Sequence, residues 1–392
     1  MSSEELWDAI VVGAGVVGSW AAYHLADSGR KVLLLDQFNL PHYRGSSHGH
    51  SRLIRQMESQ DLWPPLKTEC YHLWRKLEKD TGYDLMTING LLCVERGDHQ
   101  HIATCMKVMR KYNLDFQYLD NKMLREKYPM LDYPEDVHAL FDPQGGILVP
   151  DKCQVALREM ITRKGGVIRD LEKVGNIHPG EIVKVETSKI VYLTKSVILT
   201  PGPWAGDLLS KVGLKVPLKT MPGWPTYWQT DGTRDYRVSK GMPTVIEQMK
   251  VDDGYRFVIF CPEYEYPGMV KIASRGQPPP SYQHPDRRDQ DDKKSILKFL
   301  SGYIRDNFKG VIPIPAIEEP CMYTMTPDRK FIIDRHPVYK NIIIGAGFSG
   351  TGYKLAPVTG KLLYHMAVGN PTSYDVSEFR ITRFGNISSS KL

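Results

Sequence analysis

A glycine-rich turn near the start of the chain has the residue types and the spacing of a phosphate-binding motif. A strand-like run at 7–12 leads directly into the sequence Gly13-Ala14-Gly15-Val16-Val17-Gly18. In such a motif the first glycine allows a tight turn, the second lets the backbone approach a pyrophosphate, and the third lets a helix pack closely on the strand. The helix that follows would direct its N-terminal amide groups at an anion. The predicted dinucleotide contacts are Gly13, Gly15, Val16, Val17 and Gly18.

An acidic residue ends the second apolar run. Residues 32–35 are Val, Leu, Leu and Leu, and Asp36 follows them, at about the 20-residue distance from the glycines that dinucleotide-binding motifs show. A carboxylate at this point can accept hydrogen bonds from an adenosine ribose, so we predict that Asp36 and the adjacent Gln37 contact the cofactor. The negative charge disfavours NADP, because it would repel the additional phosphate. The motif alone does not distinguish FAD from NAD.

Two further apolar runs, far apart in the sequence, also end in glycine turns. Residues 195–200 lead into Pro201-Gly202-Pro203-Trp204, and residues 341–344 lead into a second glycine-rich motif at 345–350. Separated strand ends of this kind predict a nucleotide-binding domain that is assembled from several segments of the chain. Short β-rich runs at 90–94, 255–260 and 269–273 predict a mixed or antiparallel sheet elsewhere.

The expected fold is therefore α/β, or α+β overall, with a Rossmann-type nucleotide-binding domain and an interwoven substrate domain that contains the mixed sheet. The predicted segments of the nucleotide-binding domain are residues 1–80, 142–217 and 318–387. The predicted segments of the substrate domain are residues 81–141 and 218–317.

The composition argues against several classes of protein. The chain has 392 residues, 41% of them hydrophobic, and a formal net charge of +6, which suits a two-domain globular enzyme. Basic residues are interspersed with acidic ones, so nucleic-acid binding has little support. There is no N-terminal signal segment and no apolar run of the length that a bilayer requires, so we expect a soluble intracellular protein that does not bind membranes. The six cysteines show neither CxxC pairs nor metal-ligand spacing, so we expect no disulfide framework and no metal site.

The last three residues, Ser390-Lys391-Leu392, match the import signal of peroxisomes. We therefore expect residues 388–392 to be a targeting tail, the peroxisome to be the location, and the peroxisomal import receptor to be a partner.

Four motifs lie at residues 45–55, 265–268, 321–328 and 345–357, and the last of them contains the second glycine-rich turn. Together they resemble the monomeric sarcosine oxidase family, and within it most closely the peroxisomal sarcosine and pipecolate oxidases, from Trp7 to about Arg383. The resemblance implies an FAD-binding fold of the glutathione reductase and D-amino acid oxidase type. It also implies a monomer that takes a small amino acid substrate and oxygen.

In that family FAD is attached to the protein through a cysteine sulfur, and the resemblance assigns this role to Cys321, in the sequence Cys-Met-Tyr-Thr. A thiolate is the nucleophile that such an attachment needs, and a thioether would raise the oxidising power of the flavin and prevent its loss. The resemblance also implies a set of further cofactor contacts. These are Ser46, Ser47, His48, Arg52, Gly202, Gly347, Phe348, Gly350 and Lys354.

The resemblance implies catalytic roles for three cations. Arg55 and Lys354 match the pair that binds the substrate carboxylate, the arginine with a planar set of donors and the lysine as a point charge. Lys271, in the strand-like run 269–272, matches the lysine that promotes the reaction of reduced flavin with oxygen. A cation is suited to that step, because the first electron transfer produces superoxide.

Three positions depart from the family pattern. Arg275 and Thr351 stand where close relatives have histidine, and Ile259 stands at about the position of a pocket-lining tyrosine. We include Arg275 among the predicted catalytic residues, because its guanidinium could bind a second anionic group that sarcosine and pipecolate lack. The substrate itself therefore stays open.

The leading prediction is an FAD-dependent oxidase of secondary or N-alkyl amino acids, such as sarcosine or L-pipecolate, that forms an imine and hydrogen peroxide by hydride transfer to the flavin. One alternative is the same chemistry on a larger or more acidic amine, such as saccharopine or a fructosyl amino acid. Another is a dinucleotide-binding protein without turnover. That protein would keep the glycines but would not need Cys321, Arg55, Lys354 and Lys271 together.

Overall fold

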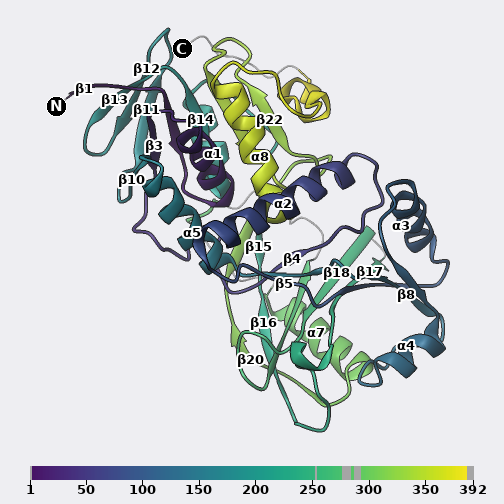
Figure 1. The fold of residues 1–392 in the computed structure, drawn as a ribbon. Helices are drawn as coiled ribbons and strands as arrows, with labels where there is room; N and C mark the ends of the chain where they lie inside the picture. Colours follow the sequence, from purple (N-terminus) through teal and green to yellow (C-terminus); the bar gives the residue numbers. More distant parts are fainter. Residues whose placement is uncertain (1, 252–253, 276–283, 287–292, 386–392) are drawn as a thin grey trace.

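The computed structural model describes residues 2–251, 254–275, 284–286 and 293–385 (Figure 1). Of Arg275 only the backbone is described, and the predicted targeting tail at 388–392 lies outside the described residues. Among the helices that the structure describes, none is long and apolar enough to span a bilayer.

A six-stranded sheet forms the centre of the upper part of the molecule in Figure 1. Its order is β10 (Val167–Arg169), β3 (Val32–Leu35), β2 (Ala9–Val12), β14 (Val197–Leu199), β23 (Ile342–Ala346) and β22 (Ile332–Arg335). All neighbours pair in parallel except β22, which runs antiparallel to β23. The carboxyl ends of the parallel strands therefore meet at one edge, where open α/β sheets bind their ligands.

The six-stranded sheet is covered on both faces, because alternate residues of its strands point to opposite sides. Val11 and Leu34 pack against a helical layer, whereas Ile10 and Leu33 pack against a second sheet. The helical layer consists of α1 (Val16–Asp27), α2 (Trp63–Thr81), α5 (Pro150–Arg163) and α8 (Gly352–Ala367). The second sheet has the order β1 (Ser2–Trp7), β13 (Val191–Thr194), β12 (Val183–Thr187) and β11 (Val174–His178). The short helix α6 (Ala205–Ser210) packs on the same side as this sheet.

An eight-stranded sheet forms the lower part of the molecule in Figure 1. Its order is β20 (Val311–Glu318), β16 (Thr226–Thr230), β19 (Met269–Arg275), β18 (Gly254–Cys261), β17 (Thr244–Val251), β6 (Leu91–Arg96), β8 (Val137–Asp142) and β7 (Gln117–Leu119). It is mixed, because β17 and β6 pair in parallel and the other neighbours pair antiparallel. The helices of this part are α3 (Gln100–Lys111), α4 (Asn121–Lys127) and α7 (Lys293–Asn307).

Two small sheets lie between the large ones and carry predicted site residues (Figure 1). One pairs β15 (Lys219–Gly223) with β21 (Cys321–Met325), and the other has the order β4 (Arg52–Ile54), β9 (Gly146–Leu148) and β5 (Met86–Thr87). Four 3-10 turns complete the described elements, at Gly202–Trp204, Val238–Lys240, Ser377–Phe379 and Ile381–Phe384. The predicted fold class is confirmed, whereas the domain boundaries stay a prediction.

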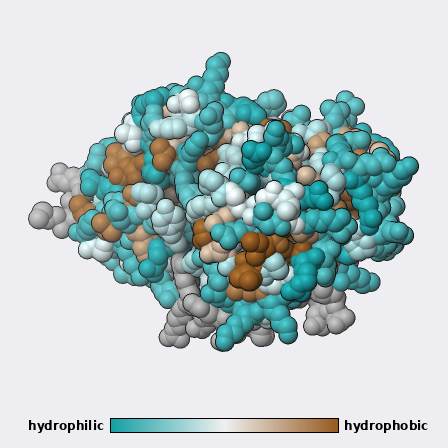
Figure 2. Space-filling view, turned by 90° about the horizontal axis from the view of Figure 1, so that it is seen from below, coloured by the Kyte–Doolittle hydropathy of each residue, from teal (hydrophilic) through white to brown (hydrophobic). Residues whose placement is uncertain are grey.

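Edge strand β20 carries an exposed apolar side chain. Figure 2 shows a mainly hydrophilic face with hydrophobic side chains gathered in a patch near its centre. Ile314 of β20 is 69% exposed, the highest value among the large hydrophobic residues of the described chain. The neighbouring Pro313 and Pro315 lack backbone N–H donors, so they hinder the addition of another strand at this edge.

Candidate functional site

A cavity of about 850 Å³ opens at the carboxyl ends of the parallel strands and extends to the eight-stranded sheet. Its size falls in the upper part of the range of roughly 300–1,000 Å³ that ligand sites occupy. Most of the predicted site residues line it, namely Gly13, Gly15, Val16, Val17, Gly18, Asp36, Gln37, Ser46, Ser47, His48, Arg52, Arg55, Gly202, Lys271, Cys321, Phe348, Gly350 and Lys354. Gly347 is not among the lining residues, and the side chain of Arg275 is outside the description.

The first glycine turn has the close contacts that its sequence predicts. Gly13 has φ +103°, and a Cβ atom there would lie 2.3 Å from the carbonyl oxygen of Thr200. A Cβ at Gly18 would lie 2.0 Å from the carbonyl oxygen of Gly13, so helix α1 approaches the turn as closely as glycine permits. The side of Gly15 is open except for Ser47 Oγ at 3.2 Å. A ligand can therefore approach the backbone there.

Asp36 and Ser47 both bind backbone amides next to this turn. Asp36 Oδ2 accepts a hydrogen bond from Ala14 N at 2.9 Å, and its Oδ1 accepts one from Phe38 N at 2.9 Å. Ser47 Oγ accepts a hydrogen bond from Val16 N, the first residue of α1, at 3.0 Å. These contacts fix the loop after β3 against the start of the helix.

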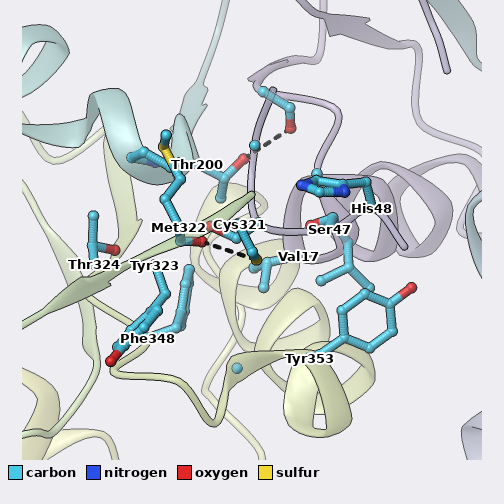
Figure 3. A pocket seen from close by; sticks show the side chains of 18 of the residues that line it. Val17, Ser47, His48, Thr200, Cys321, Met322, Tyr323, Thr324, Phe348 and Tyr353 are labelled. Carbon is cyan, nitrogen blue, oxygen red and sulfur yellow. Dashed lines mark hydrogen bonds between the residues drawn. The ribbon is translucent and has the colours of Figure 1, made fainter. Parts of the chain in front are cut away.

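Cys321 begins β21 and lines the cavity, near side chains from three other segments (Figure 3). Ser47 and His48 come from the loop after β3, Phe348 from the second glycine turn, and Tyr353 from the first turn of α8. Arg52 Nη2 lies 3.8 Å from Cys321 Sγ and donates hydrogen bonds to the carbonyl oxygens of Ser46 and His48, at 3.1 and 2.7 Å. One guanidinium therefore links the loop to the sulfur.

The other five cysteines differ from Cys321 in their environment. Cys321 is half-buried, whereas Cys70, Cys93, Cys105, Cys153 and Cys261 are buried. Burial raises the pKa of each of these five thiols, to about 12 for Cys93 and about 11 for Cys261. Raised pKa values make them poor nucleophiles at neutral pH.

Arg55 and Lys354 line the same cavity. Arg55 lies in the loop that follows β4, and Lys354 lies in α8. Glu58 Oε1 lies 3.6 Å from Arg55 Nη2. Burial alone would lower the pKa of Arg55, but the Glu58 carboxylate raises it above the usual value. Lys354 is 9% exposed, and its Nζ lies 3.5 Å from the carbonyl oxygen of Thr351. The two predicted carboxylate ligands are thus a half-buried arginine and a buried lysine next to open space.

Lys271 extends from β19 into the cavity and is held by two neighbours. Its Nζ donates a hydrogen bond to Ser51 Oγ at 3.0 Å and lies 3.3 Å from Glu265 Oε1. Tyr227 OH donates to Glu265 Oε2, and it lies 3.1 Å from Glu319 Oε2. Burial, followed by the charge of Glu265, raises the pKa of Tyr227.

Several residues of the site were not predicted from the sequence. Thr200 directly follows β14, and its hydroxyl donates to the carbonyl oxygen of Val12 at 3.1 Å. Ser349 has φ +47° and its hydroxyl accepts a hydrogen bond from Thr326 N at 3.2 Å. Both lie inside the strand-to-turn sequences at 195–204 and 341–350, so their position was a usable signal. Glu58 belongs to no motif, and nothing in the sequence pointed to it.

Known proteins resemble the chain over most of its length. A model described as FAD dependent oxidoreductase matches residues 8–366. The peroxisomal sarcosine oxidase of Homo sapiens is 38% identical, over 100% of both chains. The monomeric sarcosine oxidase of Arthrobacter sp. is 31% identical, over 98% of both chains.

Solved structures show the same fold at lower identity. NikD, an amino acid oxidase essential for nikkomycin biosynthesis, superposes with a TM-score of 0.83 at 21% identity, over 99% of both chains. Glycine oxidase from Geobacillus kaustophilus superposes with a TM-score of 0.76 at 18% identity, over 96% of this chain and 99% of the other.

Proposed function

The chain belongs to the FAD-dependent oxidoreductase family, together with the sarcosine oxidases, and on this basis we propose that it is an FAD-dependent oxidase of secondary or N-alkyl amino acids. Membership confirms the resemblance and the FAD dependence that the sequence predicts. The observation that carries the proposal is that one cavity brings together the glycine turn, Cys321, Lys271, Arg55 and Lys354.

The residues of the cavity fit a dinucleotide. The backbone at Gly15 is open, and α1 and α8 both begin at the cavity, so the positive ends of their helix dipoles favour an anionic ligand. The Asp36 carboxylate binds Ala14 N at the start of the glycine turn and lines the same cavity. The described residues would therefore hold the phosphates at the start of α1 and the adenosine near Asp36.

We also propose that Cys321 Sγ holds the flavin covalently. Three observations support this: Cys321 lines the cavity, it is the one half-buried cysteine of the six, and the Arg52 guanidinium lies beside its sulfur. A neighbouring cation stabilises the thiolate that such an attachment requires.

Arg55 and Lys354 are the proposed ligands of the substrate carboxylate. An arginine can donate two parallel hydrogen bonds to a carboxylate, and a lysine adds a point charge. Two such contacts orient the amino acid and hold its reacting carbon in place, which lowers the entropic part of the barrier. Ile246, Ile259 and Ala273 also line the cavity, so the remainder of the substrate meets an apolar wall.

Lys271 is the proposed cation for the oxygen reaction. Bound FAD would accept a hydride from the substrate and pass the electrons to oxygen, which leaves as hydrogen peroxide while the imine product hydrolyses. A buried ammonium stabilises negative charge that develops on oxygen. Ser51 and Glu265 hold the Lys271 ammonium in one position, so it needs little reorganisation when that charge appears.

Substrate and location are finer parts of the proposal. Sarcosine and L-pipecolate are the first substrates to test, and a larger or more acidic amine is the alternative, because Arg275 replaces a family histidine. The names of the relatives support a monomer and a peroxisomal location, and the Ser390-Lys391-Leu392 sequence supports recognition by the import receptor.

The test is to purify the full chain, record its absorbance spectrum, and mix it anaerobically with sarcosine and with L-pipecolate. We expect a flavin spectrum that is bleached by one of these substrates, and stoichiometric peroxide when oxygen is readmitted. A colourless protein, or a flavoprotein that no N-alkyl amino acid reduces, would overturn the proposal. Fusing residues 388–392 to a fluorescent protein tests the location separately, and a cytosolic fusion would refute it.

A further inference from the structure

A half-buried carboxylate lies between two cations next to the cavity. Glu58 Oε1 lies 3.6 Å from Arg55 Nη2 and also accepts a hydrogen bond from Lys67 Nζ. Arg55 lines the cavity, whereas Glu58 and Lys67 are not among its described lining residues. The side chain of Lys67 is only 2% exposed. The three groups thus form a row that leads from the cavity into the interior.

The loop that carries Arg55 and Glu58 is anchored from two other elements. Asp142, at the end of β8, accepts hydrogen bonds from the backbone N–H groups of Gln56 and Met57, at 2.7 and 2.9 Å. Lys67, in α2, donates to the carbonyl oxygen of Met57 at 3.0 Å. The separation between Glu58 and Arg55 is therefore set by contacts outside the loop itself.

All three groups are charged at neutral pH. Burial acts to raise the pKa of Glu58, but Lys67, Arg55 and Lys354 together lower it to about 2. Burial lowers the pKa of Lys67 to about 8, although Glu58 opposes this. Two cations and one anion leave a net positive charge in the row, which a bound carboxylate would neutralise.

We propose that Lys67 is a positioning residue for substrate binding: it holds Glu58 and thereby keeps the Arg55 guanidinium available to the substrate carboxylate. This inference rests on the proposed role of Arg55. Glu58 and a substrate carboxylate would compete for the same donors. The Arg55–Glu58 distance of 3.6 Å is longer than the 2.7–2.9 Å typical of a charge-assisted hydrogen bond. Glu58 therefore does not occupy the Arg55 donors fully, and a substrate carboxylate can still bind them.

Removal of the Lys67 ammonium changes this balance. A buried carboxylate without a partner is costly, and Arg55 would become the nearest cation to Glu58. The Arg55–Glu58 pair would close, and the substrate would have to break it in order to bind. Removal of the Glu58 charge at the same time eliminates the competitor. The effect of the first change should therefore disappear in the second.

The experiment measures ligand binding to the holoenzyme by perturbation of the flavin absorbance. The probes are tetrahydrofuran-2-carboxylate and its uncharged carboxamide, which have the same shape. The variants are Lys67→Met, Glu58→Gln and the double variant, with Arg55→Lys to test the proposed function itself. We expect Lys67→Met to weaken binding of the acid about tenfold or more, the size of one charge-assisted contact. Binding of the amide should stay unchanged.

The double variant should bind the acid within about threefold of the wild type, because it has lost both the ammonium and its competitor. A double variant as weak as Lys67→Met, or a Lys67→Met that binds the acid normally, would overturn the inference. Equal losses for acid and amide would also do so, since they would indicate a purely structural role. If Arg55→Lys binds the acid normally, the proposed function of Arg55 is what fails.

A measurement on the wild-type enzyme covers the case in which Lys67→Met does not fold. Because the pKa of Lys67 is about 8, its ammonium is present below that pH and is lost as the pH rises. Affinity for the acid should therefore fall as the pH increases through about 8, and the double variant should lack this slope. The charged or ionisable described residues that interact with Lys67 are Glu58, Arg55, Asp142, Cys70 and Cys105. An identical slope in the double variant would assign the titration to another group and refute the inference.

Discussion

Lys271 Nζ lies 3.3 Å from Glu265 Oε1, and the two side chains are 8% and 3% exposed. The ammonium proposed for the oxygen reaction is thus one half of a buried ion pair. Tyr227 bonds to the other oxygen of Glu265, so the carboxylate is fixed from a second side. The position of the ammonium in the cavity therefore depends on a residue that does not itself line the cavity in the described chain.

Replacing Glu265 with Gln should slow the oxygen reaction more than the reduction of the enzyme by substrate. The ammonium would lose its countercharge, which favours the neutral amine, and the amine would stabilise superoxide poorly. We expect a loss of about tenfold in the rate constant for reaction with oxygen, measured by stopped-flow mixing of the reduced enzyme. Glu263→Gln, in the same segment, is the matched control. Equal oxygen rates in both variants would contradict the assignment.

Replacing Cys321 with Ala should leave the flavin non-covalent. After acid precipitation the colour should stay with the wild-type protein and move to the supernatant of the variant. Cys261→Ala is the control, because Cys261 also lines the cavity but is buried, and burial raises its pKa to about 11. Colour that remains with precipitated Cys321→Ala would exclude Cys321 as the attachment site.

Replacing Lys354 with Met should weaken the binding of carboxylates. The loss of one charge-assisted contact costs about 1.5–3 kcal/mol, or roughly ten- to a hundredfold in affinity. The amide of the same ligand should bind as it does to the wild type, because it carries no charge. Titration of the flavin absorbance with both ligands measures this directly. A parallel loss for acid and amide would show that Lys354 supports the fold and does not bind the carboxylate.

The accuracy of sequence-based prediction differs between parts of this site for a physical reason. The requirements at Gly13 and Gly18 are local, since they concern a positive φ and the space for a Cβ atom, and a short motif records them. The pair between Glu58 and Lys67 depends on how a loop folds back on α2. Tyr227 and Glu319 are 92 positions apart and meet only through sheet pairing. No short pattern contains such contacts, so neither was predicted.

Replacing Gly18 with Ala should destabilise the protein and weaken its hold on FAD. The added Cβ would lie 2.0 Å from the carbonyl oxygen of Gly13 and 2.5 Å from Thr200 Oγ1. Overpacking of this kind costs about 1–3 kcal/mol. Gly302→Ala is the matched control, because Gly302 lies in α7 and a Cβ there would meet nothing within 4 Å. That substitution should be neutral or stabilise the protein by up to about 1 kcal/mol. Thermal unfolding of both variants, with flavin release monitored by fluorescence, provides the comparison.

Replacing Arg275 with His should change the choice of substrate. In β19 Lys271, Ala273 and Ser274 line the cavity, and Arg275 follows them as the last residue of that strand. Its side chain lies outside the description, so its role stays a prediction from the sequence. A guanidinium near the substrate repels a cationic amine and needs an anion to balance it. We therefore expect the wild type to turn over an N-substituted amino acid with a second carboxylate better than sarcosine.

The Arg275→His variant should shift that preference back towards sarcosine or L-pipecolate, because histidine is largely neutral above its usual pKa of about 6.5. Rates of anaerobic flavin reduction by sarcosine, L-pipecolate and N-(carboxymethyl)alanine measure the ranking in each enzyme. A residue turned outward to solvent would leave the ranking unchanged, so identical rankings in the wild type and the variant would refute the prediction. The amount of hydrogen peroxide formed per substrate oxidised is the internal control. It should be equal in both enzymes, because Lys271, the residue proposed for the oxygen reaction, is unchanged.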